Sequence, residues 1–164
     1  MSAKFLLPAA FLLLFSVECL HAQTAYEWDY YGIGFEVASD FNIVANNQSE
    51  FTAVSSDGLI SVSLMPWSDA SINLDHLADA TLQLAGELAT FDQATVNGDF
   101  VDLGDLEGYY IVAATSDYQS YDFLLVALLI DTESDTNLVV AIGFEEGNED
   151  EAIDILSSVY PYDP

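Results

Sequence analysis

Basic side chains are almost absent from this chain. Its 164 residues include one Lys or Arg against 28 Asp or Glu, a formal net charge of −27. Nucleic acids and anionic membrane surfaces are bound through Lys and Arg side chains. The composition therefore excludes both as partners, and it disfavours phosphorylated substrates for the same reason.

Cysteine is nearly absent too, and the one present lies in an N-terminal segment that is typical of an export signal. Lys4 is followed by an apolar run over residues 5–15, which is too short to cross a bilayer with margin. A small residue, Ala22, then precedes Gln23. We predict a secretory signal peptide over residues 1–22 and a secreted, cell-surface or periplasmic location. A lipoprotein signal that uses Cys19 is the alternative, although Glu18 stands where a small residue is required.

Cleavage after Ala22 would remove the one basic residue of the chain, Lys4. Residues 23–164 keep 27 of the acidic residues and contain no Lys, Arg or Cys. An ordinary domain carries charges of both signs, so this composition indicates selection against basic residues. We expect a single acidic α+β domain over residues 23–164, stabilised by its core without disulfides.

Hydrophobic periodicity predicts short strands joined by hairpins, with two helices. The predicted strands cover residues 26–30, 32–37, 41–45, 50–54, 59–65 (ended by Pro66), 100–103, 108–114, 121–130 and 138–144. One helix opens at residues 68–71 and continues to Leu88, and a second follows Asn148 as its N-cap. The two long apolar runs, 121–130 and 138–144, are typical of strands that are covered on both faces. The expected architecture is an α-β-α sandwich with a mostly antiparallel central sheet and two main helices.

Four short segments carry a resemblance to a known family. They are the strand at residues 31–37 (YGIGFEV), the helix start at 72–78 (INLDHLA), the segment LEGY at 106–109, and the closing helix at 152–158 (AIDILSS). In these segments the chain resembles the PsbP/DcrB-like family. The resemblance implies an α-β-α sandwich that acts as a binding or assembly module, with no shared catalytic residues.

The mature chain contains few groups of residues that could form a catalytic site. His76 is its single histidine, with Asp75 and Asp79 nearby, and no Gly-x-Ser-x-Gly motif is present. We interpret His76 as a solvated residue on a helix face and expect no enzymatic activity. A glycosidase-like carboxylate pair is the enzymatic alternative, because acids are numerous enough to lie close by chance.

One loop carries side-chain oxygens at alternate positions, as calcium loops do. Its residues are Asp131, Glu133, Asp135 and Asn137, between the two long apolar runs. The loop lacks the central glycine and the distal glutamate of an EF-hand, so a solvated hairpin tip is the alternative. Calcium is the one cofactor that the sequence suggests.

The missing basic residues point to proteases that cleave after Lys or Arg. Such enzymes bind the basic side chain against a carboxylate in their specificity pocket, and residues 23–164 contain no basic side chain for them to bind. Its acidity would also attract a cationic protease at long range. We therefore predict an exported, non-catalytic binding protein that resists trypsin-like proteases and docks a cationic protein such as trypsin. The alternatives are a salt-adapted envelope or periplasmic module of the PsbP/DcrB-like kind and a calcium-dependent binding module.

Overall fold

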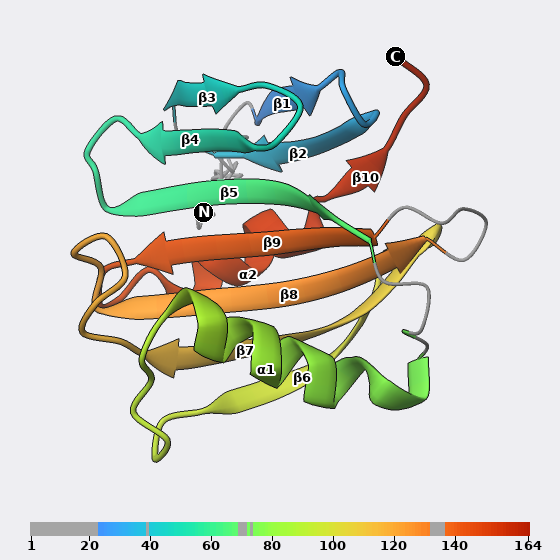
Figure 1. Cartoon of the computed structure of the whole chain (residues 1–164). Coiled ribbons are helices and arrows are strands. Elements are labelled where there is room, and N and C mark those ends of the chain that lie inside the picture. The colour runs from blue at the N-terminus through green and yellow to red at the C-terminus, as the bar shows by residue number, and fades with distance from the viewer. Residues whose placement is uncertain (1–22, 39, 69–71, 73, 132–136) are drawn as a thin grey trace, which may run out of the picture.

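The computed structural model describes residues 23–38, 40–68, 72, 74–131 and 137–164, and its centre is an antiparallel sheet. Within these residues seven strands form this sheet in the order β3-β4-β5-β9-β8-β7-β6 (Figure 1). The strands are β3 (Phe41–Asn46), β4 (Phe51–Ser55), β5 (Ile60–Trp67), β6 (Asn97–Asp102), β7 (Leu106–Ala114), β8 (Phe123–Asp131) and β9 (Asn137–Phe144). The register of β8 with β9, in which Ile130 is opposite Asn137, confirms the predicted hairpin between the apolar runs.

Helices cover the two faces of this sheet. Helix α1 (Leu77–Leu88) follows a short 3-10 turn, η1 (Leu74–His76), and packs on β7 and β8. Helix α2 (Glu149–Ser157) lies on the opposite face against β9. On that face lies a second, three-stranded sheet, β1 (Thr24–Trp28), β2 (Ile33–Val37) and β10 (Tyr160–Pro161), in the order β1-β2-β10. The predicted α+β sandwich is confirmed, and the small sheet beside α2 is an addition to it.

Strand β8 shows why long apolar runs occur here. Leu125, Ala127 and Leu129 belong to the core beneath α2 and the small sheet. Their neighbours Leu124, Val126 and Leu128 belong to the core beneath α1. Successive side chains of a strand point to opposite faces, so a strand between two cores must be apolar at every position. Each fully buried leucine contributes about 1.5–3 kcal/mol of transfer free energy.

Pro66 does not end its strand, contrary to the prediction. Strand β5 continues through Pro66, opposite Leu138, to Trp67, opposite Asn137. On its other side, the pairing of β5 with β4 stops at Leu64. A proline lacks the N–H group that a central strand needs, but it is tolerated where one side of the strand has no described strand partner.

Asn148 precedes α2 as predicted, but its side chain does not cap the helix. The Asn148 amide donates instead to the carbonyl oxygen of Glu145 at 3.1 Å. The acids Glu149, Asp150 and Glu151 lie in the first turn, where the helix dipole favours negative charge. Neither this helix nor α1 has a basic residue in its last turn. Among the described residues, no helix combines the length and hydrophobicity needed to cross a bilayer.

Candidate functional site

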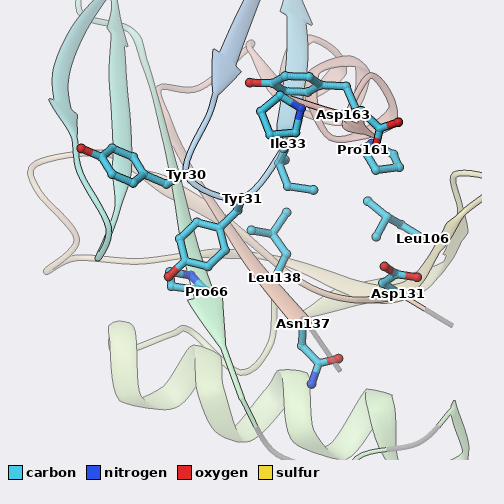
Figure 2. A pocket seen from close by; sticks show the side chains of 13 residues that line it. Tyr30, Tyr31, Ile33, Pro66, Leu106, Asp131, Asn137, Leu138, Pro161 and Asp163 are labelled. Atoms are coloured by element: carbon cyan, nitrogen blue, oxygen red, sulfur yellow. The ribbon is translucent and has the colours of Figure 1, made fainter. Parts of the chain in front are cut away.

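A cavity of about 450 Å³ opens at one end of the sandwich, between the ends of the two sheets. The turn after β1, the C-terminal tail and the ends of β8 and β9 surround it, as the side chains in Figure 2 show. Its lining residues are Tyr30, Tyr31, Gly32, Ile33, Pro66, Leu106, Asp131, Asn137, Leu138, Pro161, Tyr162, Asp163 and Pro164. Segments from both ends and the middle of the chain thus meet here.

Tyr31 forms a fixed aromatic wall of the cavity. Its ring packs on Trp28 with a centroid distance of 4.5 Å, and its hydroxyl donates to the carbonyl oxygen of Gln48 at 2.9 Å. Trp28 is itself 1% exposed, and its indole Nε1 donates to the carbonyl oxygen of Asn47 at 2.8 Å. Two hydrogen bonds to neighbouring residues of the β3–β4 turn therefore hold the β1–β2 hairpin in place.

The C-terminal tail forms the facing wall. The backbone N–H of Tyr162 donates to the carbonyl oxygen of Gly32 at 2.6 Å, and its hydroxyl donates to Asp29 Oδ1 at 2.6 Å. Burial, followed by this hydrogen bond, raises the pKa of Tyr162, so the hydroxyl keeps its proton. Gly32 has φ +60°, and a Cβ there would collide with the Tyr162 carbonyl oxygen. Glycine is thus required for the tail to approach the turn.

The cavity is acidic as well as aromatic. Asp131, half-buried at the end of β8, and the exposed Asp163 both line it. Residues 23–164 contain no Lys or Arg. Aromatic faces and carboxylates both attract positive charge. The lining is therefore suited to bind cationic groups.

The structure describes two of the four predicted calcium ligands. Asp131 and Asn137 flank the β8–β9 hairpin and both line the cavity, whereas Glu133 and Asp135 lie outside the described residues. Within the part of the chain that is described, no three Asp, Glu, His or Cys side chains cluster as metal ligands would. The calcium site at this hairpin stays a prediction.

Most of the cavity lining was not anticipated from the sequence. The sequence pattern predicts strands at Tyr30 and Tyr31, and it indicates no role for the tail at residues 160–164. The two tyrosines of that tail, YPYDP, are the available signal, because aromatic side chains bury large apolar areas when they pack. His76 lies exposed in η1 and is not among the residues that line the cavity.

Two carboxyl groups come together away from the cavity. Glu145 follows β9 and Asp122 precedes β8. A hydrogen bond between the two side chains raises the pKa of Glu145, and burial and the Asp122 charge act in the same direction. Such a bond requires that one of the two carboxyl groups carries a proton, so the pair responds to pH.

Comparison with solved structures identifies proteins of similar fold. The Ran-binding protein Mog1p of Saccharomyces cerevisiae superposes with a TM-score of 0.60 and 14% identity, over 87% of this chain and 97% of that one. PsbP (CyanoP) from the cyanobacterium Synechocystis gives a TM-score of 0.61 and 12% identity, over 87% and 94%. A Bacteroides thetaiotaomicron protein gives 0.51 and 13%, over 87% of this chain and 49% of that one.

The chain thus has a PsbP-like fold. The resemblance predicted from its sequence is confirmed at the level of architecture. No family model matches the sequence, and no curated protein matches it. At such low identities the likeness concerns the fold alone, and any activity must be argued from the residues of this chain.

Proposed function

We propose that this chain is an exported, non-catalytic binding protein whose partner is a cationic protein. The observation that carries the proposal is the charge of residues 23–164, which hold 27 acidic residues and no Lys or Arg. The acidic, tyrosine-lined cavity at the end of the sandwich supports it, because its surfaces suit positive groups.

Long-range electrostatic attraction explains how an acidic surface would bind a cationic protein. Exposed carboxylates of one sign sum to a potential that reaches about 8–10 Å into the solvent at moderate salt. On α1, for example, Asp79 is exposed and no basic residue follows in the last turn. An oppositely charged protein is steered toward such a surface, and like-charged proteins are repelled.

A trypsin-like protease is the proposed partner class. Residues 23–164 contain no Lys or Arg and so no site that such a protease cleaves, which a general need for acidity would not require. The fold is compatible with a binding role, since the Mog1p neighbour of similar architecture is described as a Ran-binding protein. A domain that remains in contact with a protease gains from resistance that does not depend on its folded state.

Two protease digestions test the resistance. Trypsin should leave the mature protein intact even when it is unfolded, whereas ordinary domains resist only while they are folded. A chymotrypsin-like protease should cleave the unfolded chain at its Tyr, Phe and Leu residues. Intact mass measurement of the exported protein should give a chain that begins at Gln23. A lipid-modified chain that begins at Cys19 would contradict the predicted cleavage.

Binding is the decisive experiment. The immobilised domain is exposed to a cationic and an anionic trypsin at low and at physiological salt. We expect the cationic form to be retained, less strongly as salt screens the charges. Equal failure of both at physiological salt would reject the proposal and favour the salt-adapted module. In that case, other proteins of the same cell should show the same lack of basic residues.

A further inference from the structure

We infer that the groove between η1 and the β6–β7 hairpin is the surface on which the cationic partner docks, with one apolar side chain of the partner in the groove and a basic side chain beside it. The inference rests on the proposed function and deepens it, since it assigns a surface to that partner. It starts from two properties of the groove, which are its exposed apolar side chains and the carboxylates that line it.

Large apolar side chains are exposed at this edge of the seven-stranded sheet. Strand β6 is the outermost strand there (Figure 1), and its Phe100 is 62% exposed. The Phe100 ring meets Tyr109 of β7 edge-on at a centroid distance of 4.9 Å, and Tyr109 packs on the core beneath α1. Leu74 of η1, 44% exposed, lines the same groove as Phe100. Exposed apolar side chains that gather in one place, rather than lie scattered, are typical of an interaction site.

The lining of the groove is acidic as well. Asp102 and Glu107 both line it, and they lie directly opposite each other in the β6–β7 ladder. Asp102 stands two positions from Phe100 and Glu107 two positions from Tyr109, so both carboxylates project from the face that carries the two rings. Like charges directly opposite each other destabilise a sheet, and a basic side chain placed between them would relieve the repulsion. The Gly104 N–H, which donates to Asp102 Oδ1 at 2.9 Å, holds one of the carboxylates in position.

Charge complementarity selects the occupant. A second pair of exposed apolar side chains, Ile43 (53%) and Val44 (67%), lies in β3 at the opposite edge of the sheet, in a strand without acidic residues. Only at the groove do exposed apolar side chains and carboxylates line one surface among these two edges. A second copy of this chain would bring carboxylates against carboxylates, so the occupant is a cationic protein.

The size of the groove indicates how much of the partner it receives. Its volume of about 270 Å³ lies below the range of roughly 300–1,000 Å³ that is usual for small-molecule pockets. The space therefore suits one apolar side chain of the partner, with the neighbouring residues of the partner lying over the carboxylates.

The partner is recognised through side chains and not through the backbone edge of β6. The Leu103 N–H donates to the carbonyl oxygen of Leu106 at 2.8 Å, and only alternate pairs of an antiparallel ladder exchange hydrogen bonds. By this alternation the N–H of Phe100 faces away from β7, where it donates to Asp99 Oδ1 at 2.8 Å. A charged side chain at an edge in this way protects the edge against the addition of a strand.

Three capped tripeptides test the groove without any partner protein. Acetyl-Arg-Leu-Arg-amide is titrated into the mature domain. Acetyl-Arg-Gly-Arg-amide is the match that lacks the apolar side chain, and acetyl-citrulline-Leu-citrulline-amide is the match that lacks the charges. NMR spectra of the isotope-labelled domain measure the affinities and locate the bound peptide by the amide signals that shift.

We expect the Arg-Leu-Arg probe to bind at least about tenfold more tightly than either match, a difference of about 1.4 kcal/mol. The largest shifts should fall at Leu74 and at residues 100–108, which contain the lining of the groove. Equal binding of the three peptides, saturable binding of none, or shifts centred on another surface would overturn the inference.

Matched variants separate the groove from the general acidity of the surface. Phe100→Ala and Leu74→Ala should each weaken the Arg-Leu-Arg probe several-fold, whereas Val44→Ala, on the opposite edge, should have no comparable effect. Asp102→Asn should weaken it too, and Asp154→Asn, the same charge change at an exposed position of α2, should not. Thermal melting confirms that each variant is folded. Equal effects within either matched pair, Phe100 with Val44 or Asp102 with Asp154, would refute a defined site.

The outcome is separable from that of the proposed function. Retention of cationic trypsin that is insensitive to Phe100→Ala and Asp102→Asn would refute the docking groove and leave the proposed function standing. Selective binding of the Arg-Leu-Arg probe without retention of any cationic trypsin would establish the groove and reject that protease as the partner. Dimerisation of the domain that Phe100→Ala abolishes, measured by sedimentation, would overturn the inference in favour of a second copy.

Discussion

Replacing Trp28 by alanine should be among the most damaging single changes in the small sheet. Its side chain is 1% exposed, contacts Tyr31 and donates a hydrogen bond to Asn47, so it joins β1, the cavity wall and the β3–β4 turn. Truncating a buried aromatic side chain of this size costs about 3–5 kcal/mol, because the cavity left behind is filled only partly. The loss is a large fraction of the 5–15 kcal/mol, roughly, that stabilises a typical domain.

Trp28→Phe measures the part of this stability loss that comes from the indole N–H group. Phenylalanine keeps an aromatic ring but removes the indole N–H, so the carbonyl oxygen of Asn47 loses its donor. We expect a loss of about 1–3 kcal/mol, intermediate between the wild type and Trp28→Ala. Tyr31→Phe is the matched control, because its hydroxyl bond to Gln48 is exposed and should contribute less than about 1 kcal/mol.

Urea unfolding followed by far-UV circular dichroism measures these changes, because the signal does not depend on the tryptophan that is removed. With a slope of about 2 kcal/mol per molar urea, Trp28→Ala should lower the midpoint by about 2 M. A loss below about 1 kcal/mol for Trp28→Ala, or equal losses for Trp28→Phe and Tyr31→Phe, would refute the view that Trp28 anchors the hairpin.

Four further outcomes follow from the charges and polar groups of the structure. The melting temperature should rise from low to moderate salt, because screening weakens repulsion among carboxylates with no basic partners; a flat profile would contradict this. The Asp122 hydrogen bond raises the folded pKa of Glu145 above its unfolded value, so this group's stabilisation is greatest below the unfolded pKa and is lost as pH rises through the folded pKa. Glu145→Gln should flatten that part of the pH profile in thermal melts, and an unchanged slope would count against the shared proton. Ser61 Oγ is buried with no hydrogen-bond partner among the described residues, so Ser61→Ala should leave stability unchanged or raise it by about 1 kcal/mol; a clear loss in urea unfolding would show that a partner exists. Calcium, titrated by calorimetry against a magnesium control, should bind with defined stoichiometry and be weakened by Asp131→Asn and Asn137→Ala if the hairpin site exists, whereas diffuse binding insensitive to both would reject it.

Much of the architecture could be predicted from the sequence because its determinants are local. A run such as residues 123–131 is apolar at every position, and only a strand between two cores requires that pattern. The helical spacing of apolar residues located α1 and α2 in the same way. Pro66 shows where local reasoning failed, since its tolerance within β5 depends on where a neighbouring strand stops pairing.

The sequence alone also determined the net charge of the molecule, because that charge is a sum over side chains and does not depend on the fold. The cavity was decided only by tertiary structure. The Tyr162 hydroxyl meets Asp29 across 133 positions of the chain, and the turn that carries Tyr31 meets Asp131 and Asn137 only after both sheets have packed. Periodicity records which residues face a core, but it carries no information on which distant segments adjoin at the end of a sandwich. Which segments adjoin there depends on how the small sheet, α2 and the C-terminal tail pack together. No single segment determines that packing.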